Sequence, residues 1–239
     1  MNNIIKNFNA VLFDMDGVLI DSNSVIERAW CEVAQMYDRE ISNDEMIKHI
    51  HGQPGPHTIS ALFGDLSAAD QQKVQDYIIY IENTAIYKPI DGVAELILAL
   101  HKVGIRIGIV TSGWRQKIDS VIKLLKVDGC ISVIVERDDV TKGKPYPDPY
   151  LLAIKRLNIP VNHTIVFEDS SSGVKSAVAA DTYCVGIGGE NLLSVGAQFT
   201  IHNSQFTITD FSAVKIVTHP NGQIMISFDD QHQLTYINP

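Results

Sequence analysis

The chain of 239 residues has no apolar stretch that could cross a membrane. A membrane-spanning helix needs roughly 18 or more consecutive apolar residues, and no run in the sequence is that long. The first residues, Met1 to Asn7, also lack the basic flank, apolar run and small-residue cleavage site of a secretory signal. We therefore expect a cytoplasmic protein with no membrane partner.

Cysteine and positive charge are also scarce. The three cysteines, Cys31, Cys130 and Cys184, lie far apart and form no CxxC pair, so neither a disulfide framework nor a zinc site is indicated. The formal net charge of -9 argues against a nucleic-acid partner, which would need a basic stripe. An anionic substrate must therefore be captured by a local site, since the charge of the whole protein repels it.

A short apolar run, Ala10 to Phe13, ends abruptly in Asp14, Asp16 and Gly17. The run predicts a buried strand of a parallel sheet. In an extended chain the side chains at 14 and 16 point to the same side, at the strand end where open α/β sheets bind ligands. Two neighbouring carboxylates repel each other unless a cation lies between them, and hard oxygen donors suit Mg²⁺.

Strands and helices alternate along most of the chain. Apolar runs predict buried strands over 10–13, 105–110, 131–135, 164–167 and 183–187. Helical spacing predicts helices over 93–100, 115–126, 150–157 and 173–180. This alternation implies an α/β fold with a doubly wound parallel sheet and right-handed crossovers.

Two regions depart from this alternation. Residues after Asp21 show helical spacing with no strand-like pattern as far as Lys88, which predicts an inserted all-helical unit. After Phe211, apolar runs at 214–218 and 223–228 flank an Asn-Gly pair, which is typical of an antiparallel β-hairpin. The predicted organisation is a core of residues 1–21 and 89–211, a helical cap of residues 22–88 and a C-terminal hairpin extension of residues 212–239.

Three of the predicted strands end in polar side chains. These groups are Asp14 with Asp16, Thr111-Ser112-Gly113, and Glu168 with Asp169, while Lys144 lies on a proline-rich loop. Because parallel strands place their carboxyl ends on one edge, we expect these groups to converge. The combination suits a phosphate ester: the acids hold Mg²⁺, the lysine and serine bind phosphoryl oxygens, and a free carboxylate attacks phosphorus.

The four motifs, in this order, resemble those of the haloacid dehalogenase (HAD) superfamily of phosphohydrolases. The stretch Asp14 to Ser22 resembles the first motif, Ser112 falls in the second, Lys144 in the third and Glu168-Asp169 in the fourth. The resemblance implies a HAD-like Rossmannoid core whose insert is similar to the helical cap of the β-phosphoglucomutase-like subfamily. The motifs Ile50-His51-Gly52, Ala61-Leu62-Phe63 and Gly143-Lys144-Pro145 look most like those of glycerol-phosphate and deoxyglucose-phosphate phosphatases.

The resemblance also implies roles for individual residues. Asp14 matches the family's nucleophile and Asp16 its general acid/base, while Ser112, Gly113 and Lys144 match the phosphate-binding positions. Asp14, Asp169 and the backbone carbonyl of Asp16 match the ligands of Mg²⁺. Glu168 is expected either to bind the metal directly or to support those ligands.

The implied function is that of a magnesium-dependent phosphatase acting on small phosphorylated metabolites, such as sugar or polyol phosphates, through an aspartyl-phosphate intermediate. A β-phosphoglucomutase-type isomerase is an alternative, although Ile26 stands where mutase relatives have a cap histidine. The phosphatases resembled carry an arginine after the cap His-Gly, whereas Gln53-Pro54-Gly55-Pro56 follows here. A non-catalytic phosphate-binding or interaction protein is a further alternative, which the intact Asp14 and Asp16 argue against. The oligomeric state and the individual substrate stay open.

Four further features lead to expectations. The cap is joined to the core only near 21–24 and 86–90, which predicts a hinge. The hairpin over 214–228 is expected to extend the edge of the core sheet or to mediate self-association. The histidines His49, His51 and His57 are expected in cap packing or a substrate-facing loop more than in a metal site. Trp114 is expected either to line the site or to pack in the core.

Overall fold

The computed structural model describes residues 8–188, 206–220, 224–228 and 233–236, the last of these for the backbone alone. Its centre is a 6-stranded sheet with the strand order β5-β4-β1-β6-β7-β8, in which all the pairs are parallel. The strands are β1 (Ala10–Phe13), β4 (Arg106–Val110), β5 (Ile131–Val135), β6 (Thr164–Glu168), β7 (Tyr183–Ile187) and β8 (Thr207–Ile208). The predicted doubly wound sheet is confirmed, and β8 is an addition to it.

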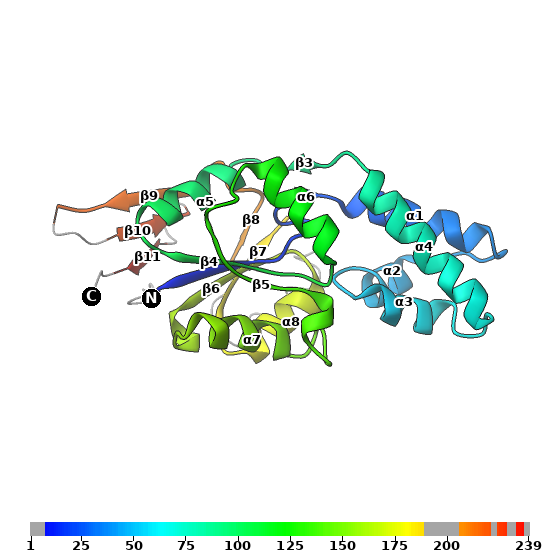
Figure 1. Cartoon of the computed structure of the whole chain (residues 1–239). Helices are drawn as coiled ribbons and strands as arrows, with labels where there is room; N and C mark the ends of the chain where they lie inside the picture. Colours follow the sequence, from blue (N-terminus) through cyan, green and yellow to red (C-terminus); the bar gives the residue numbers. More distant parts are fainter. Residues whose placement is uncertain (1–7, 189–205, 221–223, 229–232, 237–239) are drawn as a thin grey trace.

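Helices cover both faces of this sheet (Figure 1). On one face lie α5 (Val93–Lys102) and α6 (Arg115–Leu125), and on the other lie α7 (Asp148–Leu157) and α8 (Ser171–Ala179). The central strand explains this arrangement, because Val11 and Phe13 belong to one buried cluster while Ala10 and Leu12 belong to the other. Since successive side chains of a strand point to opposite faces, a strand with both faces buried is apolar throughout.

The insert between β1 and β4 is helical, as predicted. It consists of α1 (Asn23–Gln35), α2 (Asn43–His49), α3 (Gly55–Leu62) and α4 (Ala68–Thr84). These helices have a hydrophobic cluster of their own, in which Trp30, Phe63 and Ile78 are buried. A short antiparallel pair, β2 (Ile20–Asp21) with β3 (Lys88–Pro89), joins the chain where it leaves and re-enters the core.

A second, 3-stranded sheet forms at the opposite end of the core from the helical insert (Figure 1). It contains β9 (Lys215–Thr218), β10 (Ile224–Ser227) and β11 (Gln233–Tyr236), all antiparallel. The predicted hairpin is confirmed as β9 and β10, while its Asn221-Gly222 turn lies outside the described residues. The expectation that the hairpin extends the core sheet was wrong, because β8 pairs with β7 at that edge and the 3-stranded sheet is separate.

This second sheet is attached to the core by its buried side chains. Ile226 is fully buried and Phe228 is 3% exposed, and both belong to the cluster beneath α5 and α6. The ring of Phe228 lies 6.1 Å from that of Phe167 on β6 and 4.9 Å from that of Phe206. The C-terminal segment therefore contributes to the hydrophobic core.

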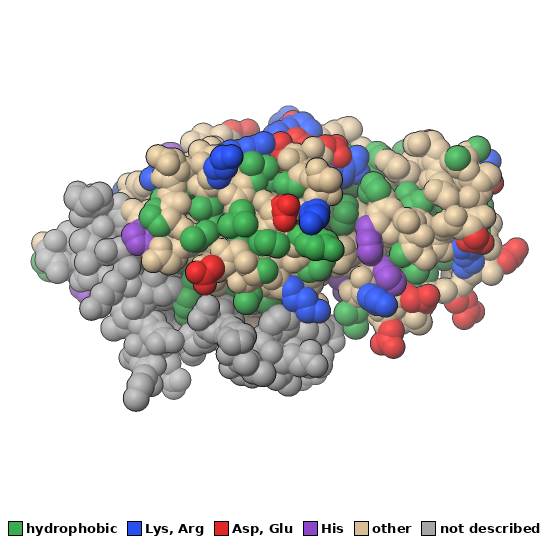
Figure 2. Space-filling model, turned by 90° about the horizontal axis from the view of Figure 1, so that it is seen from below, with side chains coloured by type: hydrophobic (Ala, Val, Ile, Leu, Met, Phe, Trp, Pro, Cys, Tyr) green, Lys and Arg blue, Asp and Glu red, His purple; other side chains and the backbone are tan. Residues whose placement is uncertain are grey.

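On the face shown in Figure 2, the lysine and arginine side chains are scattered among acidic and apolar ones and form no continuous stripe over the described residues. None of the helices in the described part of the chain combines the length and the apolarity that a membrane span requires.

We predict that Phe228→Ala lowers the free energy of unfolding by about 3–5 kcal/mol, because it leaves a cavity against Phe167. Urea unfolding followed by circular dichroism measures this loss. Lys215→Ala, on the exposed start of β9, is the matched control and should change stability by no more than about 0.5 kcal/mol. Equal stability of the Phe228→Ala variant and the wild type would show that the second sheet is not part of the core.

Candidate active site

The site begins where β1 ends. Asp14 follows Phe13 directly, and the chain then turns back so that the amide of Gly17 donates to the carbonyl of Ile20 at 2.8 Å. Gly17 has a φ of +74°, and a Cβ at this position would lie 1.8 Å from Oδ2 of Asp169. Glycine is required here both for the left-handed backbone and for the close approach of Asp169.

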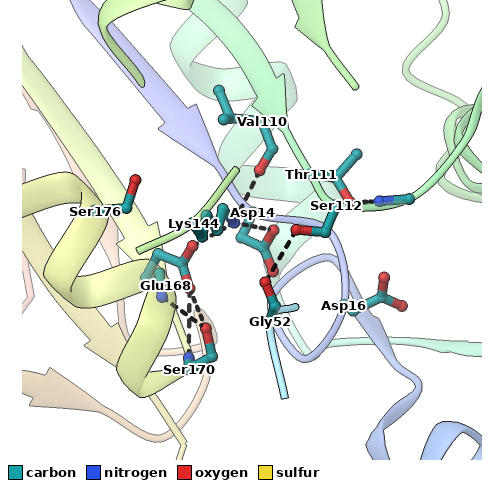
Figure 3. Close-up of polar contacts among 12 residues, drawn as sticks. Asp14, Asp16, Gly52, Val110, Thr111, Ser112, Lys144, Glu168, Ser170 and Ser176 are labelled. Atoms are coloured by element: carbon teal, nitrogen blue, oxygen red, sulfur yellow. Dashed lines mark hydrogen bonds and ion pairs between the residues drawn. The ribbon is translucent and has the colours of Figure 1, made fainter. Parts of the chain in front are cut away.

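Lys144 joins two acids in the interior (Figure 3). Its Nζ donates to Oδ1 of Asp14 at 2.6 Å and to Oε1 of Glu168 at 2.5 Å, and it also donates to the carbonyl of Val110 at 3.2 Å. The side chain of Lys144 is 1% exposed. Burial alone would lower the pKa of Lys144, but the two acids outweigh it and raise this pKa above its ordinary value.

Glu168 has both of its oxygens occupied. Oε1 accepts from Lys144 and from the hydroxyl of Tyr150 at 2.6 Å, while Oε2 accepts from the backbone and side chain of Ser170 and from the amide of Asp169. Glu168 is fully buried. Its contacts therefore fix the position of Lys144, which in turn contacts Asp14.

Asp14, Glu168 and Asp169 form a group that could hold a metal ion, since one oxygen of each lies within 4.8 Å of the others. Burial raises the pKa of Asp14 to about 7, although Lys144 opposes the shift. Burial likewise raises the pKa of Asp169 well above its ordinary value. When ionised, three carboxylates and one ammonium leave two negative charges uncompensated, which matches a divalent cation with oxygen ligands.

Asp16 lies apart from this group, and its carboxylate is turned away from Asp14 (Figure 3). Its Oδ1 accepts from the hydroxyl of Ser22 at 2.6 Å and from Nζ of Lys117 at 2.5 Å. Lys117 is on α6 and also contacts Glu82, on the cap helix α4, at 2.6 Å. Asp14 is thus paired with Lys144, and Asp16 with Lys117. Each lysine offsets the negative charge of its own acid.

Two serines of the core hold a loop of the cap. The hydroxyl of Ser112 donates to the carbonyl of Gly52 at 2.9 Å, and that of Ser172 donates to the carbonyl of His51 at 3.1 Å. The amide of Gly113 donates to Oγ1 of Thr111 at 2.9 Å within its own loop. The loop containing Gly52 thus closes over the end of β4 in this structure (Figure 3).

A cavity of about 70 Å³ lies between the core and the cap. Asp14, Asp16, Asp169 and the loop Thr111–Gly113 line it from the core. The cap contributes His51, Glu82 and a set of apolar and amide side chains, namely Asn23, Ile26, Trp30, Ile50, Gln53, Ile59, Gln75, Ile78 and Ile79. The cavity therefore places side chains of the cap opposite the acids of the core.

The structure places the remaining predicted residues as follows. His51 lines the cavity and its Nε2 lies 2.8 Å from Oε1 of Glu27, while His49 and His57 contact each other at 3.2 Å on the cap surface. None of these histidines belongs to the acidic group that could hold a metal within the described ranges. Trp114 lines the cavity, and its indole donates to Oδ1 of Asn83 at 3.0 Å.

Several residues of the site were not predicted from the sequence. By their spacing, Lys117 and Glu82 are ordinary members of amphipathic helices. Tyr150 has the spacing of an ordinary core residue of α7. Asn23 donates to Oδ2 of Asp169 at 2.9 Å from the first residue of α1. Its place directly after the motif-one stretch was a signal that could have been used, because the helix start must lie close to the end of β1.

Comparison with known proteins identifies the class to which this fold and site belong. The family described as haloacid dehalogenase-like hydrolase matches residues 11–187, which is more than half of the chain. The chain is 30% identical over 184 residues to validoxylamine A 7'-phosphate phosphatase from Streptomyces hygroscopicus subsp. limoneus, covering 75% of this chain and 85% of that protein. The chain belongs to this family and is a HAD-like hydrolase.

Two further proteins are similar to this chain over most of its length. Hexitol phosphatase A from Escherichia coli K12 is 27% identical over 217 residues, which is 90% of this chain and 97% of that protein. A crystal structure of a HAD hydrolase, family IA, variant 3, from Entamoeba histolytica superposes with a TM-score of 0.71 at 29% identity, covering 87% of this chain and 96% of that one. These similarities extend over the core and the helical cap together.

The raised pKa of Asp14 predicts how a divalent cation changes stability with pH. Its pKa is 3.8 in the unfolded chain and about 7 in the folded one, so the folded protein binds the extra proton and loses stability as the pH rises between these values. A cation replaces that proton at higher pH. We expect Mg²⁺ to raise the melting temperature over an EDTA-treated sample clearly at about pH 8 and little at about pH 5. Equal stabilisation at both pH values would contradict this assignment.

We predict that Gly52→Ala disfavours the closed cap. Gly52 has a φ of +69°, and a Cβ there would lie 2.2 Å from Oγ of Ser170 and 2.5 Å from Oγ of Ser172. We expect kcat/KM for a phosphate ester to fall about 10-fold or more, since closure excludes water and orients the substrate. Gly129→Ala, which meets nothing within 4 Å, is the control and should leave kcat/KM unchanged.

Proposed function

We propose that this hydrolase is a magnesium-dependent phosphatase that cleaves small phosphate monoesters, with a sugar or polyol as the alcohol, through an aspartyl-phosphate on Asp14. One observation carries the proposal: the carboxylate of Asp14 lines the floor of the cap–core cavity while Lys144, held by Glu168, contacts it at 2.6 Å. A carboxylate nucleophile next to a buried cation is the arrangement that attack on a phosphoryl group needs.

The residues divide the reaction between them. Asp14 attacks phosphorus in line, and Asp16 protonates the departing alcohol oxygen, so that the ester oxygen leaves as a neutral hydroxyl. Asp16 then takes a proton from the water that hydrolyses the aspartyl-phosphate, which restores Asp14. Lys144 and Ser112 stabilise the charge on the phosphoryl oxygens. To donate to phosphate, the hydroxyl of Ser112 must release the carbonyl of Gly52.

The acidic group fits Mg²⁺. Asp14, Asp169 and the backbone carbonyl of Asp16 would hold the ion, and Glu168 would serve as the support of Lys144, because both of its oxygens already accept hydrogen bonds. When bound, Mg²⁺ supplies positive charge that offsets the repulsion between the phosphoryl group and the carboxylates.

The walls of the cavity support a neutral alcohol as the rest of the substrate. Gln53 and Gln75 offer amides that can bind hydroxyl groups, and Trp30 and the isoleucines offer apolar surface. Among the described residues that line the cavity, Arg137 is the one lysine or arginine. The names of two relatives, a hexitol phosphatase and a validoxylamine phosphate phosphatase, support polyhydroxylated alcohols as substrates.

The two alternative functions fit less well. A mutase must steer the phosphoryl group to a second hydroxyl, and Ile26, which lines the cavity where mutase relatives have a histidine, cannot donate or accept a proton. A non-catalytic protein would not need a buried nucleophile between Lys144 and the cavity, since burying charges costs stability.

We also propose that the cap of residues 22–88 turns about the β2–β3 pair. The pair is held by the register Ile20 with Pro89 and Asp21 with Lys88, and the contacts from Ser112 and Ser172 would break as the cap opens. Opening and closing of this kind would admit the substrate and then exclude water from Asp14.

The decisive test compares Asp14→Asn with Asp16→Asn. Asp14→Asn removes the nucleophile, so no phosphoenzyme should form with any ester. Asp16→Asn removes proton transfer, which contributes roughly 10²–10⁴-fold. A sugar alkoxide needs that proton to leave, whereas p-nitrophenolate does not, so Asp16→Asn should still be phosphorylated by p-nitrophenyl phosphate and accumulate the acyl phosphate.

Intact-mass spectrometry after rapid quench detects the phosphoenzyme, and hydroxylamine should remove it. Loss of Mg²⁺-dependent phosphate release in both variants, on both esters and with no trapped phosphoenzyme, would contradict the role given to Asp16. Isomerised sugar phosphate in place of free phosphate from the wild type would indicate the mutase reaction instead.

A further inference from the structure

A buried lysine links the cap to the second acid of motif one. Nζ of Lys117 donates to Oδ1 of Asp16 at 2.5 Å and to Oε2 of Glu82 at 2.6 Å. The three residues come from different parts of the fold: the loop after β1, helix α6 of the core and the last turns of the cap helix α4. The exposed fractions of the side chains are 2% for Lys117 and 7% for Glu82, so the link is shielded from solvent.

Aromatic rings enclose the ammonium group. Nζ of Lys117 lies 5.3 Å from the ring centre of Tyr87 and 5.7 Å from that of Trp114. Both distances are in the range of cation–π attraction. The ammonium is therefore confined by two acids and two rings, and its position is set more tightly than that of a lysine on the surface, which has several rotamers of similar energy.

Only one of the two carboxylate oxygens of Asp16 accepts hydrogen bonds from the described residues. Ser22 and Lys117 both donate to Oδ1, and no residue in the described part of the chain donates a hydrogen bond to Oδ2. Asp16 lines the cavity and its side chain is 22% exposed. One carboxylate oxygen is thus held by the protein, and the other is left for the oxygen of a departing alcohol or an attacking water.

We propose that Lys117 is a positioning residue for proton transfer by Asp16, and that Glu82 holds Lys117 in place from the cap. This inference rests on the proposed phosphatase function. Lys117 holds Asp16 in the side-chain rotamer in which Oδ2 faces the cavity. Because Glu82 on α4 holds Lys117 on α6, this rotamer depends on the packing of α4 against α6. The carboxylate of Asp16 is therefore correctly oriented only when the cap is docked on the core.

Neighbouring hydrogen bonds also hold α4 against α6. Asn83 accepts from the indole of Trp114 at 3.0 Å and donates to Gln116 at 3.2 Å. These bonds, with the Glu82–Lys117 pair, dock the end of α4 on the start of α6, close to the β2–β3 pair. Glu82 and Asn83 are in the last turn of α4, a few residues before β3 of the proposed hinge, so the link to Asp16 would persist while the far side of the cap moves.

The test measures phosphoenzyme formation before the steady state, in the full-length protein with Mg²⁺. The probes are p-nitrophenyl phosphate and the best substrate among sorbitol, mannitol and glycerol phosphates. In Lys117→Met, the phosphorylation rate should fall about 10–100-fold with the alkyl ester and no more than about 3-fold with the aryl ester, whose leaving group needs no proton. KM should stay within about 3-fold, because Lys117 is not among the described residues that line the cavity.

Glu82→Gln should shift the alkyl-to-aryl rate ratio in the same direction but less, since Lys117 keeps its contact with Asp16. Ser120→Ala is the control: Ser120 is an exposed residue of the same helix α6, its hydroxyl donates to the carbonyl of Gln116 within that helix, and the rate ratio of this variant should equal that of the wild type. If Lys117→Met fails to fold because Glu82 is left unpaired, the double variant Lys117→Met with Glu82→Leu removes both charges and tests the same ratio.

Two outcomes would overturn the inference. In the first, Lys117→Met lowers the alkyl and aryl rates equally, or lowers neither. In the second, a crystal structure of the folded variant shows the carboxylate of Asp16 in its wild-type orientation. The second readout does not depend on catalysis, so it separates failure of this inference from failure of the phosphatase proposal, which the wild type alone reveals by releasing no phosphate from any of these esters.

Discussion

The site depends on the contact of one buried ammonium group with two buried carboxylates. Lys144 is 1% exposed and lies 2.6 Å from Asp14 and 2.5 Å from Glu168. Taking such charges out of water is costly, and only close pairing in the low-dielectric interior offsets the cost. The partners of Lys144 come from three strand ends: Asp14 follows β1, Val110 ends β4 and Glu168 ends β6. The parallel sheet brings these ends together at one edge.

The cap completes what the core leaves open. The core supplies the acids, the hydroxyl of Ser112 and Lys144, but the cavity is closed by the loop at Gly52 and by apolar and amide side chains of the cap helices. The cap also reaches the second acid through Glu82 and Lys117. In the proposed function, the alcohol of the substrate contacts the cap while its phosphate is bound by the core.

The sequence predicted best the buried strands and the polar residues at their carboxyl ends. The strands β1, β4, β5, β6 and β7 were each predicted from their short apolar runs, which are typical of strands in a parallel sheet. The strands β8 and β11 were missed, because two to four residues without an apolar run give no periodicity to detect. The site residues Asp14, Asp16, Ser112, Lys144, Glu168 and Asp169 all come from strand ends or from the loop between them, where α/β sheets carry their ligands, and the structure brings Asp14, Lys144, Glu168 and Asp169 into one cluster.

The sequence by itself determined the fold class, the family and the set of polar residues at one edge of the sheet, because these follow from local order along the chain. The tertiary structure alone decided which lysine belongs to which acid. Lys144 and Lys117 are separated from Asp14 and Asp16 by 130 and 101 positions, and no spacing rule connects residues on different elements. It also placed the C-terminal strands in a separate sheet against Phe167, since the free energy of burying Ile226 and Phe228 depends on a surface that exists only after the core has formed.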